Sequence, residues 1–346
     1  MSAAQWLRAG STALMLAAMA QAVVAAPPPA LSDAALMTPK ALGAATLAVT
    51  RAGTRLVAVG ERGTVLLSDD AGARWRQARV PVQATLTSVH FANARQGWAA
   101  GHLGVILQSD DGGETWRLQF DGLRAAQAMA AAAGPDERAQ ALAQRLIGEG
   151  ADKPFFDLAF ADAKRGFAVG AYNLAFSTRD GGATWQPLPL PNPKSLHLYG
   201  VRVVDGQVFI AGEQGLLLKS GDDGLSFTPL ASPYKGSFFG LLATRSGALI
   251  AYGLRGNALR SVDQGTSWDK VETGVQVALS AATLLDDDAP ALLGQTGDVL
   301  VSRDDGKTFK KAPPAPAVPA AGLAPAPGGQ LVLASLRGMR QQPAPR

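Results

Sequence analysis

A motif of the form Ser/Thr-x-Asp-x-Gly-x-Ser/Thr-aromatic recurs six times along this chain, and its second copy reads Ser-Asp-Asp-Gly-Gly-Glu-Thr-Trp. The first copy is looser, because Arg74 replaces the second hydroxyl residue. Successive copies are 41 or 42 residues apart, except for one interval of 69. Such a period indicates repeated units that bury their apolar faces on one another. The aromatic positions are Trp75, Trp116, Trp185, Phe227, Trp268 and Phe309.

Two turn positions keep the same register in all six units. A glycine stands fifteen residues before each aromatic, at Gly60, Gly101, Gly170, Gly212, Gly253 and Gly294. Three residues later comes Gly63, Gly104, Asn173, Gly215, Gly256 or Gly297. Asn tolerates positive φ better than most residues with a side chain. The pattern therefore predicts a left-handed turn residue at this point of every unit.

Each unit contains enough sequence for four short strands, called a to d here. In the second unit these are expected at residues 86–91, 97–101, 105–108 and 115–119. Four strands per unit of about 41 residues predict an all-β fold, the β-propeller. Residues 330–338 repeat the pattern of 248–256 and begin a seventh blade, which no seventh motif follows. We expect residues 30–42 to supply the missing fourth strand and close the ring.

The remaining segments divide the chain further. Arg8 and the apolar run 9–20 predict a signal peptide over residues 1–25, removed between Ala22 and Ala26, with an uncleaved anchor as the alternative. Residues 27–346 then form the propeller in a Gram-negative periplasm. The long interval predicts a helical insertion at about 121–150, with Leu142, Leu146 and Ile147 on one helix face. No later apolar run is long enough to span a bilayer.

Composition excludes several kinds of site. The chain has no cysteine, which removes disulfides, zinc fingers, iron–sulfur clusters and thiol nucleophiles. Its net charge of +4 comes without a Lys/Arg run, so no nucleic-acid partner is expected. The three histidines, His90, His102 and His197, lack metal-ligand spacing. We expect no metal and no cofactor. Residues 286–288 are three aspartates that suit a solvated turn, with calcium binding as the alternative.

The motifs resemble the BNR or Asp-box repeat, which sialidases also carry. Gly-Trp-Ala-Ala-Gly at 97–101, Gly-Phe-Ala-Val-Gly at 166–170 and the motif at 109–116 are more similar to photosystem II stability/assembly factor-like propellers. The resemblance implies a non-catalytic assembly factor that holds a membrane-protein partner in the cell envelope. Relatives of that family also occur in bacteria that have no photosystem. The sequence carries no signal for oligomerisation, and we expect a monomer.

Two alternatives stay open: a sialidase-like glycosidase, and a propeller that binds a glycan or small ligand. Sialidase chemistry uses arginines around the substrate carboxylate and a tyrosine nucleophile with a glutamate companion. The Arg-Ile-Pro element of that family is absent, and none of the four tyrosines has an evident glutamate beside it in the sequence.

Because strand direction alternates, the b–c turns and the d-to-a links share one face of the ring, and the Asp boxes lie on the other. We predict that this turn face binds an acidic or mixed segment of the partner, with arginines as bidentate anchors. The alternative is that the arginines are merely tolerated in exposed turns and that Phe238 and Phe239 belong to the core. The predicted binding residues are Arg62, Arg255, Arg337, Tyr172, His197, Tyr199, Tyr234, Lys235 and Phe238.

Overall fold

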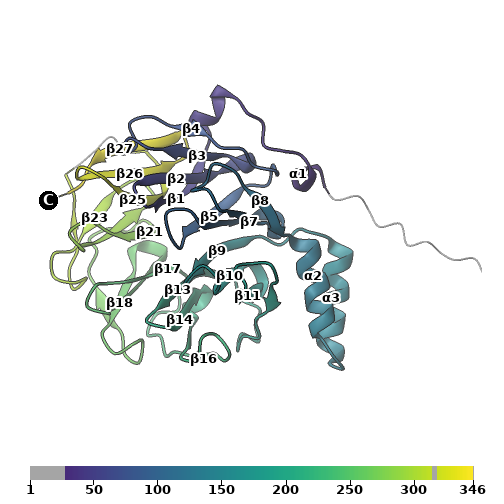
Figure 1. Ribbon diagram of the computed structural model, residues 1–346. Coiled ribbons are helices and arrows are strands. Elements are labelled where there is room, and N and C mark those ends of the chain that lie inside the picture. Colours follow the sequence, from purple (N-terminus) through teal and green to yellow (C-terminus); the bar gives the residue numbers. More distant parts are fainter. Residues whose placement is uncertain (1–27, 314–317, 346) are drawn as a thin grey trace, which may run out of the picture.

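Seven antiparallel sheets stand around a central axis in the computed structural model, which describes residues 28–313 and 318–345 (Figure 1). The seven-bladed propeller is confirmed. The first strand of each blade is innermost and contacts the first strands of the two neighbouring blades, so that these seven strands form a closed inner ring. The expected signal peptide lies outside the described residues. In the part of the chain that is described, no helix has the length and apolar character needed to cross a bilayer.

The first three blades follow the four-strand order that the repeat predicts. Blade one contains β1 (Thr46–Ala52), β2 (Arg55–Gly60), β3 (Val65–Ser68) and β4 (Arg76–Gln77). Blade two contains β5 (Leu86–Phe91), β6 (Gly97–Gly101), β7 (Ile106–Ser109) and β8 (Arg117–Phe120). Blade three contains β9 (Phe155–Phe160), β10 (Gly166–Gly170), β11 (Ala175–Thr178) and β12 (Gln186–Pro187).

The later blades repeat the pattern until the last one. Blade four contains β13 (Leu198–Val204), β14 (Gln207–Gly212), β15 (Leu217–Ser220) and β16 (Thr228–Pro229). Blade five contains β17 (Phe238–Ala243), β18 (Leu249–Gly253), β19 (Ala258–Ser261) and β20 (Asp269–Val271). Blade six contains β21 (Leu279–Leu284), β22 (Pro290–Gly294), β23 (Val299–Val301) and β24 (Lys310–Lys311). In blade seven the described part of the chain forms three strands, β25 (Ala320–Ala326), β26 (Gln330–Ser335) and β27 (Gly338–Pro343).

The core lies between blades. In blades one to six, side chains on the second and third strands alternate between the two neighbouring blades, and nearly all of them are buried. The aromatic residue of each Asp box packs into the cluster between its own blade and the preceding one; Trp116, for example, joins Leu67 of blade one and Leu107 of blade two. Burial of one such side chain contributes about 1.5–3 kcal/mol.

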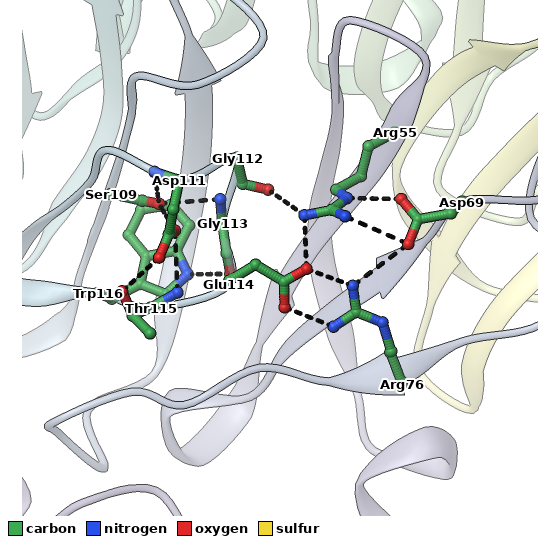
Figure 2. A network of polar contacts seen from close by, with 10 residues as sticks. All are labelled: Arg55, Asp69, Arg76, Ser109, Asp111, Gly112, Gly113, Glu114, Thr115 and Trp116. Carbon is green, nitrogen blue, oxygen red and sulfur yellow. Dashed lines mark hydrogen bonds and ion pairs between the residues drawn. The ribbon is translucent and has the colours of Figure 1, made fainter.

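The Asp box itself is a hydrogen-bonded turn, as Figure 2 shows for blade two. The Ser109 hydroxyl donates to Asp111 at 2.8 Å and accepts the Gly113 N–H at 2.8 Å. Asp111 in turn accepts the backbone N–H of Thr115 at 3.0 Å and its hydroxyl at 2.5 Å. The indole N–H of Trp116 donates to the Gly113 carbonyl at 2.9 Å. These bonds satisfy the polar groups of the turn within the turn, which supports a structural role for the motif.

An ion-pair network attaches this turn to blade one (Figure 2). Arg55 reaches Asp69 at 2.6 Å and Glu114 at 2.9 Å, and Arg76 bonds the same two carboxylates at 3.2 Å and 2.5 Å. The pKa values of Asp69 and Glu114 are held below their usual range mainly by the hydrogen bonds from Arg55 and Arg76 respectively. The network orients the two blades at the outer edge of the ring.

The ring closes differently from the expectation for residues 30–42. These residues form the short helix α1 (Pro29–Ser32) and the 3₁₀ turn η1 (Pro39–Gly43), and no described residue supplies a fourth strand to blade seven. The segment follows the link between blades one and two instead, where the Ala35 N–H donates to the Val80 carbonyl at 2.9 Å. Pro39 explains part of the difference, because it fixes φ and lacks an N–H for a sheet.

Blade seven is joined to blade one through a few specific contacts. The Thr46 hydroxyl donates to the Ser335 carbonyl at 3.2 Å and accepts the Ser335 N–H at 3.0 Å, and all of these groups are buried. The Gly338 N–H donates to the Ala44 carbonyl at 3.0 Å. Closure therefore depends on packing and on this reciprocal pair of hydrogen bonds rather than on a shared sheet.

Residues 121–150 form two antiparallel helices beside the outer strands of blade three, α2 (Gly122–Ala132) and α3 (Glu137–Glu149) (Figure 1). Asp121 and Asp136 cap them through backbone N–H groups. Ala143 is the residue of α3 that is fully buried, whereas Leu142 and Ile147 remain 46% and 43% exposed. Leu146 is half-buried, so the apolar face expected for this helix packs only in part.

Candidate functional site

The b–c turns have the left-handed geometry that the glycine pattern predicts. Gly63, Gly104, Asn173, Gly215 and Gly256 have φ between 66° and 80°. The residue before each of them is also left-handed, which the sequence did not indicate; these are Arg62, Leu103, Tyr172, Gln214 and Arg255, with φ between 51° and 60°. Such a conformation is uncommon for a residue with a side chain. Predicted binding residues therefore occupy strained positions at the tips of turns.

The turns and the d-to-a links do lie on one face. In every blade, the N–H of the first turn residue donates to the carbonyl of the residue that precedes the innermost strand. Glu213 donates in this way to His197 at 3.0 Å, and Leu254 to Ser237 at 3.0 Å. Each link is therefore fixed against its own turn, and the two kinds of segment form one surface, called the turn face below.

The three predicted anchors are separated around this face. Arg62, Arg255 and Arg337 occupy corresponding turns of blades one, five and seven, and each is exposed. Arg337 differs from the other two, because its turn is held by the Ser335 hydroxyl, which accepts the Arg337 N–H at 3.2 Å. Blades one and seven are neighbours, whereas blade five lies two positions away, so the three cations line an arc of the rim.

Three of the predicted aromatic residues meet in one cluster. The Tyr172 and His197 rings are 4.5 Å apart between centroids, and the Tyr172 N–H donates to His197 Nδ1 at 2.9 Å. His197 and Tyr199 are 6.0 Å apart. Tyr172 is 62% exposed, and Lys153 Nζ lies 5.8 Å from the centre of its ring. Blades three and four thus present a partly exposed aromatic surface beside a cation.

Two further aromatic residues extend this cluster and are not among the predicted binding residues. Phe156 and Phe239 occupy the same position of the innermost strand as Tyr199, one blade to either side. Their ring centroids lie 5.4 Å and 5.3 Å from that of Tyr199. In the other blades this position holds Leu47, Thr87, Ser280 or Ala321. Comparison of equivalent strand positions was the signal that could have found them.

Glu213 is a third residue of this region that is not among the predicted binding residues. Its carboxylate accepts the His197 N–H at 2.8 Å and lies 3.5 Å from the Tyr199 hydroxyl. Burial, and then the negative charge of Glu213, raise the pKa of Tyr199. The fold therefore gives Tyr199 a glutamate neighbour that was not evident in the sequence. The raised pKa disfavours the phenolate that a tyrosine nucleophile would need.

The remaining link residues divide between surface and core. Lys235 is exposed, and Tyr234 is half-buried with its hydroxyl donating to the Leu254 carbonyl at 3.1 Å. Phe238 is completely buried against Phe209 and Leu241. The prediction that Phe238 contacts the partner is wrong. Phe238 is the first residue of β17, and its side chain packs between blades four and five. Phe239, the next residue, faces the aromatic cluster instead.

Polar residues near the axis pair with one another. Arg202 donates to Asp157 at 2.6 Å, and Asp157 also accepts from Ser88 at 2.7 Å. These contacts join the inner strands of blades two, three and four. Burial, with the charge of Arg202, lowers the pKa of His90 in the same region to about 4. His90 and Arg202 occupy matching strand positions, as the repeat predicts.

The three aspartates at 286–288 bind arginines from three different blades. Asp286 pairs with Arg51 at 3.0 Å, Asp287 with Arg303, and Asp288 with Arg245 at 2.9 Å. Each carboxylate therefore has its own cation, and the turn is bridged rather than simply solvated. Within residues 28–313 and 318–345 no group of three or more metal-ligating side chains is present.

Comparison with known proteins places the fold and the motifs in context. A family model described as photosynthesis system II assembly factor YCF48 matches residues 38–129 and 139–268, more than half of the chain. The photosystem II assembly lipoprotein Ycf48 of Synechococcus sp. (strain CC9902) is 32% identical over 122 residues, which are 33% of this chain and 35% of that protein. The alignment thus spans about a third of the length of this relative.

Solved structures share the architecture at low sequence identity. YCF48 bound to D1 peptide has a TM-score of 0.66 at 15% identity, with 91% of this chain and 97% of that chain covered. YCF48 from Cyanidioschyzon merolae has a TM-score of 0.63 at 16% identity, covering 89% and 97%. A GH74 enzyme of Niastella koreensis has a TM-score of 0.61 at 13% identity, covering 89% and 53%. These likenesses concern the fold, and the match of the family model shows that the chain belongs to the photosynthesis system II assembly factor YCF48 family.

Proposed function

We propose that this chain is a non-catalytic assembly factor that is exported to the periplasm and holds a segment of an envelope membrane protein on its turn face. The observation that carries the proposal is the combination of exposed arginines on three turns with the aromatic cluster around Tyr199 on the same face. Arg and aromatic side chains dominate the energetics of protein interfaces. A relative of the same family has been solved as YCF48 bound to D1 peptide, which supports binding of a peptide segment.

The two parts of the surface have different tasks in this proposal. The arginines attract and orient carboxylates of the partner, because guanidinium groups form bidentate bonds with them. The aromatic cluster buries an apolar part of the same segment, which slows its dissociation. Affinity then comes from a few contacts on a rigid ring, and no bond of the partner is made or broken.

The test is capture of crosslinked envelope proteins on the tagged chain, followed by mass spectrometry. The key variant reverses Arg62→Glu, Arg255→Glu and Arg337→Glu together. A matched control reverses three exposed cations on the Asp-box face, Arg95→Glu, Lys164→Glu and Lys307→Glu. We expect one membrane protein to be enriched by the parent and the control and lost with the turn-face variant. Equal capture by both variants would contradict the assignment of the face.

The glycosidase alternative is tested separately with a fluorogenic sialoside. We expect no hydrolysis by the parent chain above the rate with Tyr199→Phe. Turnover that disappears in Tyr199→Phe and in Glu213→Gln would favour an enzyme, because those two residues are the tyrosine and glutamate that the fold brings together.

A further inference from the structure

Six blades share a feature of their third strand that the seventh lacks. In each of the six, one residue of that strand faces the preceding blade and is buried in the same cluster as the aromatic of its own Asp box. These residues are Leu66, Leu107, Phe176, Leu218, Leu259 and Leu300, and each is at most 4% exposed. The pairing registers place Arg340 at the equivalent position of blade seven, where it is exposed.

The outermost strand of blade seven, β27, is also unusually long. The outermost strands of the other blades contain two to four residues, whereas β27 contains six. Among the described residues it pairs on one side only, with β26. A strand edge of this length can accept another extended chain. The turn η1 contacts β27, and it does so near Gly338, at one end of the edge.

A hollow of about 380 Å³ lies next to this edge, between β23 and β24 of blade six and the residues that follow β27. Its lining includes Val301, Lys310 and Pro345. Val301 is the equivalent of Leu67 in blade one, against which Gly113 from the Asp box of blade two packs. The hollow thus occupies the place where an Asp box of blade seven would have covered blade six.

The side chains of β27 alternate between two directions. Met339 packs on Trp75 and the other residues between blades seven and one, and Gln341 donates to the Ala71 carbonyl of blade one at 2.8 Å. Arg340 and Gln342 therefore face blade six, toward the hollow. Every second side chain of an added strand would point in the same direction.

The charge around the hollow is positive. Its lining contains Arg303, Lys310 and Lys311, and Arg340 stands on the adjacent strand. Arg303 pairs with Asp287, and Lys311 pairs with Asp298 at 2.8 Å, whereas Lys310 and Arg340 have no carboxylate partner among the described residues. Asp304 is the carboxylate among the described lining residues, and its two oxygens are held by the Thr308 N–H and hydroxyl at 2.9 Å and 2.7 Å. An acidic extended segment complements this surface, because cations flank both sides of its path.

Other occupants fit the edge less well. Residues 314–317 of the chain read Pro-Ala-Pro-Ala, and their two prolines have no N–H to donate to a neighbouring strand. In a second copy paired through the same strand, Arg340 would face cations of an identical edge, and like charges across a strand pair are destabilising. The chemistry of the edge favours an acidic partner over both.

We propose that blade seven takes up an extended acidic segment of a partner protein, which pairs with β27 as a fourth strand and directs its carboxylates toward Arg340 and Lys310. The segment completes the blade in the way that the fourth strand completes the other six. This interaction is distinct from the proposed function of the turn face and does not depend on it.

The test uses the full chain and the synthetic peptide Ac-(Glu-Val)₅-NH₂, with Ac-(Lys-Val)₅-NH₂ as the charge control. Binding is followed by fluorescence anisotropy of labelled peptides and by hydrogen–deuterium exchange of the protein. We expect saturable binding of the Glu peptide, at least tenfold weaker binding of the Lys peptide, and slower exchange of β27 amides when the Glu peptide is bound. Binding without added protection of β27 would overturn the proposal.

Strand addition has a second signature in the peptide backbone. Every second N–H of an added strand points toward its neighbour, so N-methylation of all Glu residues or of all Val residues should abolish binding in one case and spare it in the other. Arg340→Glu with Lys310→Glu should weaken binding of the Glu peptide at least tenfold, whereas the triple reversal on the turn face should leave it unchanged. Equal losses with both N-methylated peptides would contradict strand pairing.

Two results would show that the edge is already occupied. In the first, the β27 amides exchange as slowly without peptide as the amides of β23 do. This would mean that the chain fills its own edge. A dimer that Arg340→Glu dissociates would mean that a second copy does so. Either result overturns the proposal of a partner segment.

Discussion

Individual residues carry the hydrogen bonds that shape the repeat. Ser109 is 1% exposed, and its hydroxyl is both the donor to Asp111 and the acceptor for the buried Gly113 N–H. Thr178 makes the same bonds in blade three, at 2.8 Å and 2.9 Å. The side-chain oxygen matters here, and the additional methyl group of threonine is tolerated in an equivalent setting.

Ser109→Ala should lower the free energy of unfolding by about 1–3 kcal/mol, because it leaves a buried N–H without an acceptor. Ser109→Thr should restore most of that loss. Urea denaturation followed by tryptophan fluorescence measures both. Equal stabilities of the alanine and threonine variants would show that the hydroxyl does not hold the turn.

Stability should depend on pH through His90. Its pKa is lowered to about 4, first by burial and then by the charge of Arg202, so the folded state favours the neutral ring. The unfolded state takes up a proton below pH 6.5, and stability is therefore lost as the pH falls from 6.5 to 4, by up to about 1.4 kcal/mol per pH unit. His90→Gln should flatten the profile across this window, and His102→Gln, at an exposed turn, should not. Parallel profiles for the parent and His90→Gln would exclude this role.

At the scale of elements, the b–c turns combine backbone strain with exposed side chains. The positive φ of Arg62 and Arg255 costs free energy that a glycine at the same place would not. A turn that keeps arginine there gives up stability at a position that can contact a partner. The strain also occurs at Leu103 and Gln214, so it belongs to the turn type itself.

Arg62→Gly should raise the free energy of unfolding by up to about 1 kcal/mol, since it relieves the left-handed conformation. The same substitution should weaken capture of the partner. Thermal unfolding and the crosslinking assay measure the two effects on one variant. A destabilised Arg62→Gly would show that the side chain has a structural contact worth more than the strain.

Sequence periodicity predicted most elements and a part of the site. The blade number, the strand order and the left-handed glycines follow from local spacing, because each unit repeats the same backbone requirements. The Tyr199–Glu213 contact and the burial of Phe238 do not, because they depend on how a link folds over its own turn. The missing strand of blade seven was wrongly assigned to residues 30–42 because ring closure was assumed to require a complete sheet.

At the scale of the whole molecule, the ring is closed where its contacts are most widely separated in sequence. Thr46 and Ser335 are 289 positions apart, and they exchange two buried hydrogen bonds. The Arg51–Asp286 ion pair links blades one and six past blade seven, but it is partly exposed and adds little. The blade one–blade seven junction should therefore be the place at which the ring opens first.

Thr46→Val should remove both hydrogen bonds and leave the Ser335 N–H unpaired, at a cost of about 1–3 kcal/mol. Hydrogen–deuterium exchange should become faster in β25 and β26 before it changes in blades three and four. A uniform increase over all seven blades would instead indicate that the ring unfolds as one unit.

The distance between these two residues along the chain has a consequence for how the protein is made. Blades one to six can each pack on a neighbour as soon as it has been synthesised, but Thr46 has no partner until Ser335 emerges. Contacts of such long sequence separation slow folding. Until then the nascent propeller is an open arc with the apolar sides of its first and sixth blades uncovered. If such a chain crossed a membrane in an extended state, it would form this open arc on the far side. The ring would close there when the segment that contains Ser335 arrived last.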